Sequence, residues 1–263
     1  MGFTHPTAAE GSVGFTHPTV VGPLWNNALS KPARSIAGYA VHAFTASGIV
    51  PAGLALAELA KDSPDPRWVF VLLLITTLID AVDGPMARAV DIKRSAPSID
   101  GRTIDDILDY LTFAVIPLLL TWRMGWIVDG LGWTVMVGMF ASLLGFANVT
   151  AKDEARGLFR GFPSYWNLYA LYAGWLHHLY GPWPGTLLLW ALAVATVAPI
   201  WLIYPNLAPP RWKPWVMGGA VVWTLALLAL LPSFPVIGGW TLAATAIYPA
   251  FYVSASWRVA RLE

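Results

Sequence analysis

The sequence predicts an all-α integral membrane protein with about eight transmembrane helices, each needing about 20 apolar residues. Hydrophobic residues make up 57% of the 263-residue chain and charged residues only 12%, a balance too apolar for an average soluble domain. The 15 Trp residues suit a protein with long water–lipid interfaces. The 16 basic and 15 acidic residues nearly cancel, which argues against nucleic acid as a partner. The absence of cysteine excludes disulfides, thiolate metal sites and cysteine nucleophiles.

A short polar segment precedes the apolar part of the chain. Residues 1–23 contain the unit Gly-Phe-Thr-His-Pro-Thr twice and have too little apolar length for a signal peptide. We therefore expect a disordered N-terminal tail over 1–23, followed by a single membrane-embedded domain over 24–263.

Uncharged stretches locate the helices that can cross a hydrocarbon core of about 30 Å. Residues 161–210 and 214–257 contain no Asp, Glu, Lys or Arg, and each stretch is long enough to cross twice. Polar or Pro-rich interruptions divide them at 177–185 and at 232–235. Further apolar stretches lie near 38–60, 67–87, 104–122 and 131–150, which brings the predicted total to eight helices.

The basic residues are distributed unevenly between the two sides of this eight-helix arrangement. Thirteen of the 16 fall on one side, and only Lys61, Arg67 and Arg123 fall on the other. Because Lys and Arg in short loops favour the cytoplasmic face, both termini and the loop 88–102 are predicted to be cytoplasmic. An odd number of crossings would mix the two groups.

Seven of the fifteen acids lie between residues 80 and 109. Asp80 and Asp83 are three residues apart, and Asp105 and Asp109 are four apart, so each pair shares one helix face. Both pairs occur at the cytoplasmic ends of consecutive, antiparallel helices. We therefore expect four carboxylates to converge at one depth.

Carboxylates packed this closely repel one another, and a divalent cation removes the repulsion. Hard oxygen ligands suit Mg²⁺ or Mn²⁺, and four carboxylates can hold two such ions. The alternative is a set of solvated helix-end acids neutralised by Arg88, Arg94 and Arg102. Asp106 points away from the Asp105 face and is expected to pair with Arg102, so it is not part of the metal set.

The residues around the acids form a specific pattern, Asp80-x2-Asp83-Gly84-x2-Ala87-Arg88-x12-Gly101-x3-Asp105-x3-Asp109. This pattern resembles the hallmark motif of the CDP-alcohol phosphatidyltransferase family. Most members have about eight residues between the Arg and the second Gly, whereas twelve stand here. The longer spacer is similar to that of the bacterial phosphatidylcholine synthase branch, as are residues 41–48 before the motif and 162–167 after it.

The resemblance implies the family fold with two additional helices, and an enzyme that transfers the phosphatidyl group of CDP-diacylglycerol to choline with release of CMP. It implies two Mn²⁺ or Mg²⁺ ions on Asp80, Asp83, Asp105 and Asp109, with Asp109 also acting as the general base. By the same resemblance Gly84, Ala87, Arg88 and Gly101 line the CDP-diacylglycerol site. It further implies a bacterial cytoplasmic (inner) membrane location, an active site facing the cytoplasm and a homodimer.

Aromatic faces and an acid suit the quaternary ammonium of choline, and such residues follow the motif. Asp153, Glu154, Tyr165 and Trp166 are the candidates, although aromatic residues at a membrane boundary more commonly form an interfacial belt. His42 on the first helix either faces the site or makes a helix-packing hydrogen bond.

Two other functions remain open at this point. A sister transferase that uses serine or another small alcohol fits the same motif. A divalent-cation transporter fits the intramembrane acids, but it does not account for the Gly, Ala-Arg and Gly positions.

Overall fold

The structure, a computed structural model, describes residues 31–262 and is predominantly helical. The expected tail over 1–23 lies outside the described residues. The first half of the chain contains α1 (Lys31–Ala46), α2 (Ile49–Leu59), α3 (Pro66–Ala89), α4 (Ile92–Ser95), α5 (Gly101–Asp109), α6 (Ile116–Arg123) and α7 (Val135–Phe146). The second half contains α8 (Trp166–Tyr180), α9 (Pro182–Val197), α10 (Lys213–Leu230), α11 (Gly239–Thr245) and α12 (Ile247–Leu262).

Three helical stretches are long and apolar enough to cross a membrane, namely Pro32–Leu59, Pro66–Ala89 and Lys213–Ser233. Two shorter apolar helices span Gly132–Phe146 and Pro182–Val197. Large apolar side chains point outward from the third stretch, where Val222 is 69% exposed. Such a surface suits contact with lipid, so the chain is a membrane protein of mainly α-helical structure. The count of eight crossings stays a prediction.

A small antiparallel sheet departs from the all-α prediction. It consists of β1 (Lys152–Asp153), β2 (Leu158–Arg160) and β3 (Trp201–Ile203) in the order β1-β2-β3. Strands this short leave no readable alternation in a sequence. The prediction of helix was therefore wrong for the part of 161–210 that follows α9. There Ala198 is extended, with ψ 150°, because the residue before a proline avoids the helical region.

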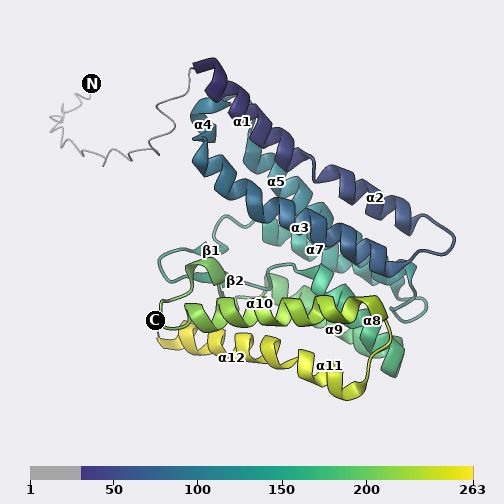
Figure 1. Cartoon of the computed structure of the whole chain (residues 1–263). Coiled ribbons are helices and arrows are strands. Elements are labelled where there is room, and N and C mark those ends of the chain that lie inside the picture. The colour runs from purple at the N-terminus through teal and green to yellow at the C-terminus, as the bar shows by residue number, and fades with distance from the viewer. Residues whose placement is uncertain (1–30, 263) are drawn as a thin grey trace, which may run out of the picture.

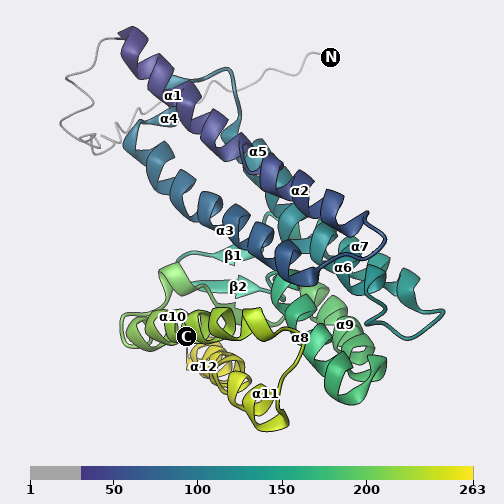
Figure 2. The same cartoon turned by 45° about the vertical axis from the view of Figure 1, so that its right-hand side comes forward.

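The helices form two groups on opposite sides of the molecule (Figures 1 and 2). One side is formed by α1, α2 and α3, and the other by α10, α11 and α12. The sheet lies beside the second group, and the Tyr252 hydroxyl of α12 donates a hydrogen bond to the Ile203 carbonyl of β3 at 2.6 Å. The hydrophobic core between the groups includes the fully buried Trp166 and Trp175 of α8.

Side-chain caps fix the start of the two helices that carry the acids. Asp65 precedes α3, and its Oδ1 accepts the Arg67 backbone N–H at 3.0 Å. Asp100 precedes α5, and its carboxylate accepts the Arg102 backbone N–H at 3.1 Å and the Thr103 hydroxyl at 2.8 Å. The hydrogen bond from Thr103 is the main reason that the pKa of Asp100 is lowered. Each cap satisfies backbone donors that a helix start leaves free.

Candidate metal centre and active site

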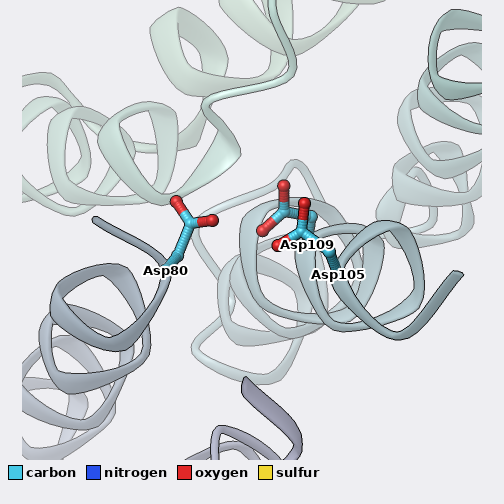
Figure 3. A group of neighbouring side chains, drawn as sticks. All are labelled: Asp80, Asp105 and Asp109. Atoms are coloured by element: carbon cyan, nitrogen blue, oxygen red, sulfur yellow. The ribbon is translucent and has the colours of Figure 1, made fainter. Parts of the chain in front are cut away.

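Three of the four predicted acids converge between two neighbouring helices. One oxygen each from Asp80, Asp105 and Asp109 can be chosen so that all lie within 4.8 Å of one another. Asp80 comes from α3, and the other two come from successive turns of α5. Figure 3 shows their carboxylates directed into the space between these helices. The i, i+4 spacing read from the sequence thus puts Asp105 and Asp109 on one face.

Asp83 lies at the same place but is not a member of this trio. It is 7% exposed, and it lines one small cavity together with the three other acids. The cavity measures about 10 Å³, which is roughly the space of a single water molecule. All four acids therefore border one site, with Asp83 at its edge.

Two of the three basic residues offered as an alternative means of neutralising the acids are engaged elsewhere. Arg94 Nε lies 3.5 Å from Asp91, and Arg102 Nε lies 3.6 Å from Asp106. The expected Arg102–Asp106 pair is thereby confirmed. Within residues 31–262, none of the three converging acids forms an ion pair with a basic side chain. No basic side chain of this part of the protein therefore offsets their mutual repulsion through an ion pair.

A divalent cation fits this donor set. Carboxylate oxygens are hard ligands of the kind that Mg²⁺ and Mn²⁺ prefer, and the three side chains already approach within the span of one coordination sphere. An added positive charge removes the repulsion that half-buried carboxylates otherwise suffer. The residues present therefore suit a divalent metal ion, whose identity the ligand chemistry leaves open between magnesium and manganese.

Two threonines that the sequence reasoning missed also border the cavity. Thr76 and Thr112 line it with the acids, and both are buried. Thr76 lies one turn before Asp80, and Thr112 lies three residues after Asp109. The helical period that grouped the acids would have found them. Their hydroxyls donate to the carbonyls of Leu73 and Leu108, at 2.7 and 2.9 Å.

The helix that carries Asp105 and Asp109 changes its winding just after the second acid. Tyr110–Val115 is π-helical and joins α5 to α6. Pro117 follows in the first turn of α6, where it can neither donate to the carbonyl four residues earlier nor fit beside it. A wider turn before the proline relieves this conflict, and π-turns are frequent at functional sites.

The small residues of the motif differ in their surroundings. A Cβ built on Gly101 would lie 2.7 Å from Cε1 and 2.9 Å from Nδ1 of His42, so only glycine permits this approach. A Cβ on Gly84 would lie 3.5 Å from Nη1 of Arg88, which is an ordinary contact. Arg88 is exposed and Ala87 is half-buried. The motif therefore supplies one close helix contact and one exposed guanidinium.

The four residues predicted to bind the acceptor have different surroundings in the structure. Trp166 is fully buried, and its indole N–H donates to the Ser142 hydroxyl at 2.6 Å, so it packs in the core. Tyr165 is 39% exposed and contacts Phe113 edge to face at 6.0 Å. Asp153 and Glu154 lie at the β1–β2 turn, where Asp153 accepts the Arg156 backbone N–H at 3.1 Å.

A larger cavity lies elsewhere in the molecule. It measures about 490 Å³ and is lined mainly by apolar side chains at the far ends of α2 and α6. Its charged member, Arg123, donates hydrogen bonds to the carbonyls of Lys61 and Asp62 at 2.7 and 3.0 Å. With no acid among its lining residues, this cavity lacks the groups that phosphoryl chemistry needs.

Comparison with known proteins gives several relatives. A phosphatidylcholine synthase of Bradyrhizobium diazoefficiens is 34% identical over 211 residues, which cover 76% of this chain and 73% of that protein. A phosphatidylcholine synthase of Pseudomonas aeruginosa is 32% identical over 68% of this chain and 74% of its own length. One from Rhizobium meliloti is 29% identical over 77% of this chain and 83% of its own length. No family model matches the chain. Identity at this level over most of both sequences, together with the acid-lined site, shows that the chain belongs to the phosphatidylcholine synthase family.

Proposed function

We propose that this protein transfers the phosphatidyl group of CDP-diacylglycerol to choline and releases CMP. The observation that carries the proposal is the convergence of Asp80, Asp105 and Asp109 from α3 and α5, within a motif that resembles the hallmark of the CDP-alcohol phosphatidyltransferases. Curated relatives named phosphatidylcholine synthase support choline as the acceptor. The spacing of the acids supports a metal-dependent reaction but does not indicate which alcohol is the acceptor.

Divalent cations held by Asp80, Asp83, Asp105 and Asp109 would neutralise the diphosphate of the donor and the charge that develops on the leaving phosphate. Asp109 takes the proton from the choline hydroxyl. The choline oxygen then forms a bond to the phosphorus that bears diacylglycerol, and the bond from that phosphorus to the bridging oxygen breaks. The bridging oxygen leaves with CMP, and the products are phosphatidylcholine, CMP and one proton on Asp109.

The remaining motif residues are proposed to hold the donor. Gly84 leaves space for close approach, Gly101 brings the start of α5 against His42, and Ala87 presents a small side chain. Arg88 is exposed on the last turn of α3, where its guanidinium can bind a phosphate oxygen. Together these positions form a CDP-diacylglycerol site that adjoins the acids.

Tyr165 is the strongest of the proposed acceptor residues. It directly precedes α8 and is 39% exposed. An accessible aromatic face suits a quaternary ammonium group. Trp166 supports this site from the core, and Asp153 and Glu154 are proposed to add negative charge from the β1–β2 turn.

In the membrane, the chain is proposed to cross eight times, with both termini and the metal centre on the cytoplasmic side of a bacterial inner membrane. The distribution of 13 basic residues against three supports this orientation. We also propose a homodimer, on the basis of the family resemblance alone. Chemical cross-linking in native membranes tests it, and a protein that yields only monomers would contradict it.

One assay separates the proposed activity from its rivals. Purified protein in detergent receives CDP-diacylglycerol with labelled choline, serine, inositol or glycerol phosphate, and lipid product and CMP are both measured. We expect a labelled lipid from choline alone, with CMP in equal amount. Incorporation of serine in place of choline identifies a sister transferase. Cation flux in proteoliposomes without CMP release identifies a transporter.

A further inference from the structure

His42 presents a buried nitrogen that lacks a hydrogen-bond partner. Its side chain lies on α1 and the residue is 4% exposed. Nε2 is shielded from solvent and has no partner among the residues that the structure describes. Buried polar atoms are nearly always hydrogen-bonded, so an unpaired one calls for a functional explanation.

The position of His42 links it to the metal centre. Thr45, which follows it on α1, and Gly48, which directly precedes α2, both line the acid cavity. On its other side, His42 contacts Gly101, the first residue of α5. Gly101 lies four residues before Asp105, which corresponds to about 6 Å along the helix axis. The backbone that the imidazole contacts therefore lies roughly one helical turn from Asp105.

The polar groups nearest to this contact are already occupied. The Tyr39 hydroxyl lies 2.7 Å from the Ser98 hydroxyl, with which it shares a hydrogen bond. The Asp100 carboxylate accepts from the Arg102 backbone and the Thr103 hydroxyl. These hydrogen bonds stabilise the turn before α5. None of these groups is a hydrogen-bond partner of His42 Nε2.

We propose that His42 Nε2 hydrogen-bonds the nucleoside of the nucleotide-linked lipid donor. The inference rests on the proposed function and adds a residue outside the acidic motif to the donor site. The phosphates belong at the carboxylates, where cations offset their charge, and the exposed carboxylate of Asp100, the residue before Gly101, disfavours a second anion. Base and ribose carry neutral donors and acceptors, which an imidazole matches in either tautomer.

The acceptor is an unsuitable partner for the same atom. Choline has a single hydroxyl, which must face the phosphorus, and its ammonium offers no hydrogen bond to a ring nitrogen. The aromatic residue proposed to contact the acceptor, Tyr165, precedes α8 rather than lying on α1. Donor and acceptor therefore contact different walls of the site, and His42 belongs to the wall formed by α1 and α5.

Access to Nε2 runs through the connection before α5. Three successive contacts tie this connection to α1: Ser95 lies against Gly38, Ser98 bonds to Tyr39, and Gly101 lies against His42. Residues 97–100 are exposed. This turn is the part that must shift when a nucleoside reaches the nitrogen.

Three substitutions and a matched control test the proposal. His42→Phe keeps a ring of similar volume and removes both nitrogens. His42→Gln places an amide near the Nε2 position, whereas His42→Asn places one near Nδ1. His177→Phe is the control, because His177 Nδ1 is also buried without a partner in the described part of the chain, but it lies near the end of α8. The readouts are the inhibition constant of CMP, the KM for each substrate and the melting temperature.

We expect His42→Phe to raise both the CMP inhibition constant and the KM for CDP-diacylglycerol at least tenfold, with the KM for choline and the melting temperature unchanged. His42→Gln should recover most of the affinity, His42→Asn should not, and His177→Phe should match the wild type. Unchanged CMP inhibition in a folded His42→Phe protein overturns the proposal, as does a lowered melting temperature with unaltered KM values. Wild-type protein that makes no phosphatidylcholine instead rejects the proposed function.

Discussion

Gly101 at the start of α5 lies against the imidazole of His42 on α1, so closely that a Cβ at position 101 would be 2.7 Å from Cε1. Gly101→Ala should therefore force the two helices apart and lower stability by about 1–3 kcal/mol, the usual cost of overpacking. His42→Ala in the same chain should return most of the melting temperature without restoring activity. Thermal unfolding in detergent, measured for both single variants and the double variant, checks this. If the double variant were no more stable than Gly101→Ala alone, the contact with His42 would not be the cause of the lost stability.

Asp105 and Asp106 offer a matched pair for testing the metal centre. Asp105 belongs to the converging trio, while Asp106 pairs with Arg102 on the exposed face. Asp105→Asn should weaken metal activation on the order of 100-fold, because a primary ligand has been lost. Asp106→Asn should stay within about twofold, as surface pairs contribute little. Titration of product formation with Mn²⁺ measures both, and equal effects of the two changes would contradict the assignment.

Removal of the divalent cation should abolish product formation reversibly. Chelation leaves the carboxylates of α3 and α5 without an opposing charge, and the donor diphosphate then meets a negative site. Addition of Mg²⁺ or Mn²⁺ should restore the rate. The measurement is CMP release before chelation, after it and after replenishment. Full turnover in rigorously chelated protein would exclude a metal-dependent mechanism.

Asp109→Asn should remove turnover more than donor binding. An amide keeps the shape of the side chain but cannot accept the choline proton, and loss of a general base costs about 10²–10⁴-fold in rate. The kcat should fall by that factor, while the KM for CDP-diacylglycerol changes less. Steady-state kinetics with both substrates decide the matter, and a variant with wild-type kcat would remove Asp109 from the proton transfer.

Tyr165 and Trp166 should respond differently to substitution despite being neighbours. Trp166→Ala should cost about 3–5 kcal/mol of stability, as expected for a buried aromatic residue, and leave Ser142 without its partner. Tyr165→Leu should raise the KM for choline and preserve the melting temperature, because its ring is accessible. Paired measurements of unfolding and choline kinetics test both. If Trp166→Ala kept full stability but raised the KM for choline, Trp166 rather than Tyr165 would be the residue that contacts choline.

The cap of α3 predicts a pH-dependent contribution to stability. The hydrogen bond and charge of Arg67 lower the pKa of Asp65, so its stabilising effect is present above the unfolded pKa, about 3.9, and is lost as the pH falls through the lower folded value. Asp65→Ala should cost about 1 kcal/mol near neutral pH. The difference from wild type should disappear once the cap is protonated. Melting curves at several pH values test this, and a pH-independent difference would contradict it.

The sequence was sufficient for the membrane class and for the pairing of acids on α3 and α5, because both depend on composition and helical period. Trp166 could not be assigned from the sequence. An aromatic residue near a cytoplasmic boundary gives the same sequence pattern whether its ring faces a ligand or packs in the core. The strands at 152–153, 158–160 and 201–203 were missed because each is too short to show an alternating pattern, and because the third strand pairs with a segment about 40 residues earlier. The role of His42 stayed open until its contact with Gly101 appeared.

All residues that line the acid cavity belong to the segment between Thr45 and Thr112. During synthesis, the chain has therefore produced every one of them before Tyr165 leaves the ribosome. The residues of the proposed cation site all belong to the helices that are inserted first. Tyr165, proposed to contact the acceptor, is added only when α8 is inserted. The residues proposed to bind the cation are thus all inserted ahead of the residue proposed to contact the alcohol.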